Sequence, residues 1–263
     1  MSGHSKWNNI KRKKEKTDGQ RAKIFTKLGR EMAVAIKEGG PDPNSNGKLR
    51  EIIAKAKANN VPNDNIDRAI KKAVADSDKS DFFEITYEGY GLGGIAVMVE
   101  ALTDNRNRTA ADVRSAFSHA NGNLGTSGSV AFQFERKGQI FIEKEIEGGK
   151  KEGMIANGAA GDEDEFMMVV AEAGGDDYED ADEEWIVYTA PNDLMAVKKA
   201  IEEQGVATKG AEFIMEPTTP TQVSVSDAKK VMRLIDKLEE LEDLQNVYHT
   251  MEITDEIAAA LDE

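Results

Sequence analysis

The sequence contains no cysteine, and aromatic residues make up only 6% of its 263 residues. The lack of thiols excludes disulfide bonds and thiolate metal sites, and it fits a reducing compartment. No apolar run approaches the roughly 20 residues that a membrane helix needs, and the basic N-terminus lacks the apolar segment of a secretory signal. We therefore expect a cytoplasmic protein without membrane contact. A hydrophobic share of 39% favours several small domains over one large core.

Charge is distributed unevenly along the chain. The formal net charge is −15, yet residues 1–30 contain ten Lys/Arg and two acidic residues, a net of +8. Residues 1–80 have a net charge of +9, which leaves −24 for the remainder. A concentrated basic end on an acidic protein favours a nucleic-acid contact. The alternative is a solvated, disordered tail that keeps the N-terminus soluble.

The residues expected to contact nucleic acid are the cations of this segment and one aromatic residue that could stack on a base or ribose. They are Lys6, Trp7, Lys11, Arg12, Lys13, Lys14, Lys16, Arg21, Lys23, Lys27 and Arg30.

The first 80 residues predict an arm followed by three short amphipathic helices. Residues 1–20 have little apolar surface to bury, so we expect a largely unstructured arm. Apolar residues then recur at helical spacing in three segments separated by Gly, Pro and Asn. Asn44 or Asn46 can cap the second helix, and Pro62 suits the start of the third. These helices predict a small bundle.

Beyond residue 80 the apolar period changes to two, which is typical of strands. We expect strands at Phe83–Glu88 and Ile95–Val99, and a helix from about Thr109. Ala131–Glu135 and Gln139–Glu143 flank Arg136-Lys137-Gly138, which predicts a hairpin. Residues 144–161 are poor in large apolar side chains and predict a surface insertion.

From Gln139 to Glu216 the expected order is strand, helix, strand, strand, helix, strand, as in ferredoxin-like sandwiches. The flanking segments supply the strands and helices of a second sandwich with permuted order. The predicted fold class is therefore α+β: an N-terminal three-helix bundle and two ferredoxin-like two-layer α/β sandwich domains, the last inserted into the middle one. The predicted domains are 1–78, 79–136 plus 217–263, and 137–216.

Several stretches resemble the YebC family, a widespread group labelled probable transcriptional regulators. They are Ser2–Trp7, Phe25–Glu31, Asn63–Ile70, Tyr87–Gly91, Thr103–Thr109, Gly128–Phe132 and Gln245–His249. The resemblance covers both ends and the middle of the chain. It implies a helical bundle with two α/β domains, and nucleic-acid binding. The family is described both as DNA-binding regulators and as ribosome-associated translation factors, including a similar mitochondrial translational activator.

Other candidate sites are weaker. Arg106 and Arg108 could hold an anion at the start of a helix, or they could pair with neighbouring acids. Asp112, Ser115 and His119 share one helix, which cannot easily align a nucleophile, a base and its orienting group. The three histidines (His4, His119 and His249) show no metal-ligand spacing, so we expect no metal, no cofactor and no catalytic residue. The acidic stretch 176–184 lacks the glycine-centred loop of a calcium site.

We prefer the hypothesis of a non-enzymatic, DNA-binding regulator of transcription. The first alternative is a ribosome-associated factor that binds ribosomal RNA and acts on elongation. The second is an enzyme or small-ligand binder that uses a cleft between domains, and no convergent set of acids and bases supports it. The sequence predicts no oligomeric state.

Overall fold

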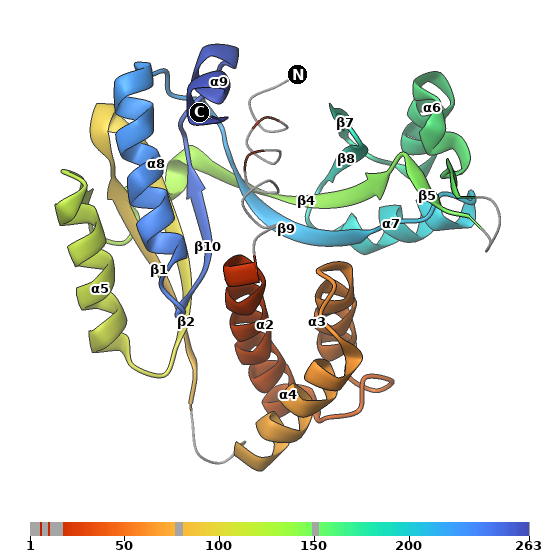
Figure 1. Cartoon of the computed structure of the whole chain (residues 1–263), viewed down its shortest axis with the longest axis horizontal. Coiled ribbons are helices and arrows are strands. Elements are labelled where there is room, and N and C mark those ends of the chain that lie inside the picture. Colours follow the sequence, from red (N-terminus) through yellow and green to blue (C-terminus); the bar gives the residue numbers. More distant parts are fainter. Residues whose placement is uncertain (1–5, 7–9, 11–17, 77–80, 149–152, 263) are drawn as a thin grey trace. The chain divides into compact units, whose positions relative to one another are not determined.

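The computed structural model describes all residues except 1–5, 7–9, 11–17, 77–80, 149–152 and 263 (Figure 1). It is a mixed α/β structure in which an N-terminal helical region precedes two antiparallel four-stranded sheets. By contacts the chain divides into two compact units. One comprises Met1–Arg12 and Glu135–Glu216, and the other comprises Lys13–Phe134 and Pro217–Glu263. The predicted three-domain boundaries stay a prediction.

The helical region consists of α2 (Asp18–Gly39), α3 (Gly47–Ala58) and α4 (Asn63–Asp76). Helix α2 contacts both other helices, and the three apolar stripes expected from the sequence form one core (Figure 1). The buried side chains of that core are Leu28, Met32, Ala35, Ile36, Leu49, Ile52, Ala56, Ile66 and Ala73.

Asn46 fixes the joint between α2 and α3. Its side-chain oxygen accepts a hydrogen bond from the Leu49 amide at 3.0 Å, which caps α3. Its side-chain nitrogen donates to the carbonyl groups of Ala35 at 2.7 Å and Gly40 at 2.8 Å. One buried amide therefore satisfies groups at the end of one helix and the start of the next. Of the two predicted caps, Asn46 is the one used.

The first sheet has the order β10-β2-β1-β3, and every neighbouring pair is antiparallel. The helices α5 and α8 contact each other and lie side by side over one face of it (Figure 1). Gly89 of β1 permits this packing, because a Cβ at this position would lie 2.7 Å from Phe117 of α5. The elements are β1 (Phe83–Tyr90), a 3-10 turn η1 (Leu92–Gly94), β2 (Ala96–Thr103), α5 (Arg106–His119), β3 (Asn123–Leu124), a 3-10 turn η2 (Ala131–Gln133), α8 (Val225–Glu239), β10 (Leu244–His249) and α9 (Asp255–Asp262).

The permuted order expected for this sheet is confirmed. Helix α5 connects β2 to β3 with β1 between them, as a split β-α-β unit does. Strand β10 follows α8 and lies on the other side of β2. This is the strand arrangement of a ferredoxin-like sheet in which one central strand, β1, comes first along the chain.

The inserted unit has the ferredoxin-like order without permutation, β7-β8-β4-β9. Its apolar core lies between this sheet and its two helices, and Phe166 stacks on Trp185 with ring centroids 5.1 Å apart. A short hairpin, β5 with β6, occupies part of the predicted surface insertion. The elements are β4 (Phe134–Glu143), β5 (Glu145–Glu147), β6 (Met154–Ala156), a 3-10 turn η3 (Gly158–Gly161), α6 (Glu163–Ala173), β7 (Asp177–Ala181), β8 (Glu184–Thr189), α7 (Leu194–Glu203) and β9 (Gly210–Pro217).

The predicted hairpin around Arg136-Lys137-Gly138 is wrong. Residues 134–143 form one continuous strand, β4, and Gly138 pairs with Thr189 of β8. A Cβ at Gly138 would lie 2.8 Å from Leu194 Cδ1, so this glycine serves close packing and not a turn.

Three other expectations also need correction. Lys6 and Ile10 have helical backbone and Ile10 is buried, so the arm is not unstructured at these positions. Helix α5 begins at Arg106 and not at Thr109, because the Asn105 side chain accepts a hydrogen bond from the Arg108 amide at 3.1 Å. Helix α9 was not predicted.

Candidate nucleic-acid interface

The predicted interface lies partly outside the described residues. Trp7, Lys11, Arg12, Lys13, Lys14 and Lys16 are among those that the structure leaves out. Lys6 is half-buried, and Arg21 lies in the first turns of α2. Their contact with nucleic acid stays a prediction.

The predicted cations of α2 are less accessible than the sequence suggested. Lys23, Lys27 and Arg30 are all half-buried, because α2 packs in the helical core on one side. Arg30 forms ion pairs with Glu242 and Asp243. Within the described structure, Arg30 therefore has partners in the same chain.

Four cations of the other two helices are exposed. In the described part of the chain, the side chains of Arg50 and Lys57 of α3 and of Lys71 and Lys72 of α4 form no hydrogen bond or ion pair. Lys48 of α3, by contrast, pairs with Glu38 at 3.0 Å. The sequence prediction missed these four residues because the arm has the denser run of positive charge. Their signal is the seven-residue spacing of Arg50 and Lys57, which places both on one face of α3.

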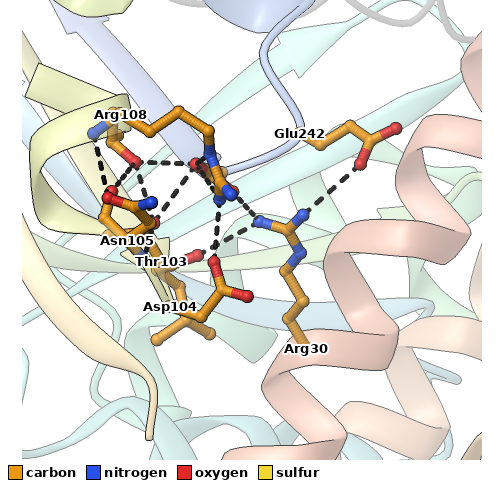
Figure 2. A network of polar contacts seen from close by, with 9 residues as sticks. Arg30, Thr103, Asp104, Asn105, Arg108 and Glu242 are labelled. Carbon is orange, nitrogen blue, oxygen red and sulfur yellow. Dashed lines mark hydrogen bonds and ion pairs between the residues drawn. The ribbon is translucent and has the colours of Figure 1, made fainter. Parts of the chain in front are cut away.

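A buried carboxylate connects α2 to the first sheet domain. Asp243 precedes β10, and its side chain is only 9% exposed. It accepts hydrogen bonds from Arg108 Nη2 at 2.8 Å and from the Thr109 hydroxyl at 2.7 Å, and it pairs with Arg30. Figure 2 shows Arg30 reaching from the helix on one side and Arg108 from the start of α5 on the other.

The charge state of Asp243 follows from these contacts. Burial by itself raises the pKa of its carboxyl group. Hydrogen bonds from Thr109, Arg108 and Arg30 have the larger, opposite effect and lower the pKa to about 2. The carboxylate is therefore ionised at neutral pH, and it neutralises part of the charge of both guanidinium groups. The hydrogen bonds that Arg108 forms with Asp243 and Asp104 raise the pKa of Arg108.

The cavity beside this network is polar and has a volume of about 370 Å³. Two guanidinium groups, those of Arg30 and Arg108, line this cavity. Four carboxyl groups line it as well and outnumber them: Asp104, Asp112, Glu242 and Asp243. Arg108 is paired with Asp104 and Asp243, the second of the two alternatives that the sequence left open. Arg106 lies with its guanidinium 3.9 Å from the centre of the Phe83 ring. Anion binding by these two arginines stays a prediction.

Of the three residues considered for catalysis, two contact each other and the third lines the cavity. The Ser115 hydroxyl lies 3.2 Å from His119 Nδ1 on the exposed face of α5, and Asp112 lines the cavity instead. Among the described residues, no group of His, Asp and Glu side chains could hold a metal ion. In the same part of the chain, no helix combines the length and apolar character needed to cross a membrane.

Comparison with known proteins gives matches along nearly the whole chain. A model of the TACO1/YebC N-terminal domain matches residues 5–76, and a model of the TACO1/YebC second and third domain matches residues 82–251. The chain belongs to the TACO1/YebC family.

Its TACO1/YebC relatives are similar over their full lengths. A protein from Clostridium botulinum strain Okra is 50% identical over 96% of this chain and 97% of its own length. One from Thermoanaerobacter pseudethanolicus is 49% identical over 97% and 99%. Both are named probable transcriptional regulatory proteins. The crystal structure of a conserved hypothetical protein from Aquifex aeolicus is 42% identical, with a TM-score of 0.77 over 91% of this chain and 93% of that one.

Two stretches that carried the resemblance to TACO1/YebC proteins meet in the first sheet domain. Glu88, in Tyr87–Gly91, is 4% exposed and accepts hydrogen bonds from three backbone amides in Gly128–Phe132. Burial raises the pKa of Glu88, but the bonds from Gly128, Val130 and Ala131 lower it to a value below normal. A carboxylate thus holds the loop in one conformation.

Proposed function

We propose that this protein binds nucleic acid and regulates gene expression without catalysing a reaction, and that its target is DNA. The observation that carries the proposal is the set of exposed, unpaired cations on α3 and α4, at the basic end of a chain with a net charge of −15. The names of the relatives support a regulatory role. The proposal places the protein in the cytoplasm, and it assigns no catalytic residue and no cofactor.

Electrostatics supports this choice of surface. Each Lys or Arg that neutralises a phosphate releases counterions, and this contribution to binding is independent of sequence. The inserted unit has the opposite character, because residues 135–216 contain 22 acidic and 8 basic residues. Its field repels a polyanion and directs nucleic acid to the helical region and the basic segment before it.

Ribosomal RNA is the alternative target, with an effect on elongation. One observation favours it. Phe132, in the loop held by Glu88, is 74% exposed, and an exposed ring suits an unpaired base better than a closed duplex.

The salt dependence of binding tests the proposed surface. Replacing Lys11, Arg12, Lys13 and Lys14 by Ala should flatten the slope of log K against log salt by up to about four. Replacing Arg50, Lys57, Lys71 and Lys72 by Gln should do the same for α3 and α4. The matched control replaces four cations elsewhere, Arg114, Lys199, Arg233 and Lys237, by Gln. Slopes equal to that of the wild type in both test variants would rule out the proposed surface.

Sedimentation of a cell lysate through sucrose separates the two targets. Migration with ribosomes that survives DNase and is lost after RNase supports ribosomal RNA. Recovery of specific promoter DNA by crosslinking, with no protein in the ribosome fractions, supports DNA.

A further inference from the structure

Phe132 is an exposed aromatic residue on an otherwise well-packed domain. It lies in the 3-10 turn η2, two residues before Phe134, which is buried. Among the described residues of its unit, the only other exposed large apolar side chain is Val74, in the helical region, and it is 45% exposed against 74% for Phe132. Phe132 therefore stands apart from any extended apolar surface.

The segment around Phe132 carries no charge. Residues 120–134 contain no Asp, Glu, Lys or Arg, in a chain of which 32% is charged. The exposed residues of this segment include Thr126, Ser127 and Gly128. The segment therefore has no carboxylate of its own, and the Glu88 carboxylate behind it is only 4% exposed and is bonded to three loop amides.

The loop is fixed in position by contacts on both sides of the ring. Glu88 binds the amides of Gly128 at 2.7 Å, Val130 at 2.7 Å and Ala131 at 2.8 Å. The Tyr90 hydroxyl donates to the Ser129 carbonyl at 2.9 Å and accepts from Gln133 Nε2 at 3.1 Å. The three bonds to the Glu88 carboxylate are charge-assisted, and such bonds are among the stronger ones in proteins. An exposed ring on a loop with these anchors loses little conformational entropy on binding.

We propose that Phe132 stacks on an unpaired nucleobase, while the exposed hydroxyl groups of Thr126 and Ser127 contact the adjoining sugar and phosphate. This inference rests on the proposed function and adds a second contact to it. A single ring among Gly, Ser and Thr is what base stacking needs, because every base offers an aromatic face. A protein partner would instead require a wider apolar patch.

The test compares affinities for paired and unpaired strands by fluorescence anisotropy. The probes are a labelled 20-nucleotide RNA of mixed sequence, the DNA strand of the same sequence, and the blunt DNA duplex of that sequence. Phe132→Ala should weaken binding of the unpaired RNA by about fivefold or more and leave the duplex within about twofold. Phe132→Trp should restore the affinity. An equal loss on the DNA strand assigns the contact to any unpaired strand, and a loss on RNA alone assigns it to RNA.

Phe213→Ala is the matched control, because Phe213 is 43% exposed and belongs to the inserted unit. It should bind all three probes as the wild type does. The salt slope of Phe132→Ala should equal that of the wild type, because stacking releases no counterions.

The outcomes separate this inference from the proposed function. If the wild type binds none of the probes, the proposed function fails. If it binds and Phe132→Ala binds equally well, only the stacking contact is overturned. A loss of equal size on the duplex also overturns it. The stacking contact is also overturned if Phe132→Ala loses a protein partner while its binding of nucleic acid is unchanged.

Discussion

Arg30 of α2 and Asp243, which precedes β10, form an ion pair between residues 213 positions apart in the sequence. The two side chains are 18% and 9% exposed. Arg108 binds the same carboxylate from α5, so one acidic residue connects the helical region to both the sheet and its covering helix. Nucleic acid, which we predict Arg30 to contact, would have to compete with Asp243 for that guanidinium group.

We expect Asp243→Ala to lower the free energy of unfolding by roughly 3 kcal/mol, because it leaves two arginines beside a buried position without their counter-ion. Urea denaturation measures the change. Asp104→Ala is the control, because the Asp104 side chain is 50% exposed and the pair with Arg108 should contribute less than about 1 kcal/mol. Equal effects of the two substitutions would contradict the anchoring role of Asp243.

The stability of the fold should depend on pH through Asp243. Its pKa is about 2 in the folded protein, below the usual value of 3.8 for an aspartate, so its contribution is present above pH 4 and lost as the pH falls toward 2. The shift corresponds to roughly 2 kcal/mol. Unfolding free energies measured between pH 5 and 2 should fall less steeply for Asp243→Asn. Parallel curves for the two proteins would show that another group titrates.

Glu88→Gln should loosen the loop that presents Phe132. The amide NH₂ group replaces an oxygen that accepts hydrogen bonds, so at least one backbone amide faces a donor. We expect a loss of about 1–3 kcal/mol in unfolding free energy and faster proteolysis between residues 125 and 133. Glu84→Gln, at an exposed position on the same strand, should change neither. Unchanged proteolysis in Glu88→Gln would mean that the loop is held by its other contacts.

Gly138→Ala should destabilise the inserted unit by about 1–3 kcal/mol, because the added methyl group overlaps Leu194 and Thr189. Gly210→Ala on β9 should be nearly neutral, because nothing lies within 4 Å of a Cβ at that position. Thermal unfolding monitored by circular dichroism compares the two. A neutral Gly138→Ala would imply that β4 and α7 can move apart at little cost.

Helices and strands with clear apolar periods could be predicted from the sequence. Met32 and Ile36 in α2, and Leu234 and Leu238 in α8, all face a core as their spacing indicates. The hairpin predicted at Gly138 was wrong because glycine beside charged residues is typical of turns. Only the neighbouring strand and helix show why glycine is needed there.

The contacts of the candidate site could not be predicted in the same way. Periodicity reports which face of an element is apolar, but it does not report which elements meet. Arg108 and Asp243 are 135 residues apart, and nothing local to either indicates the pair. For Arg50 and Lys57 the necessary signal was present in the sequence, and the higher charge density of the N-terminal segment obscured it.

The nesting of one sheet domain inside another determines the order in which they can form during synthesis. All strands of the inserted sheet are complete at Pro217, but β10 of the surrounding sheet is made only at Leu244–His249. Until then β2, whose residues are almost all buried in the finished protein, has one edge without its neighbour. The inner domain is therefore the first that can complete its sheet on the ribosome, and the outer one has an unpaired apolar strand edge until nearly the whole chain has been made.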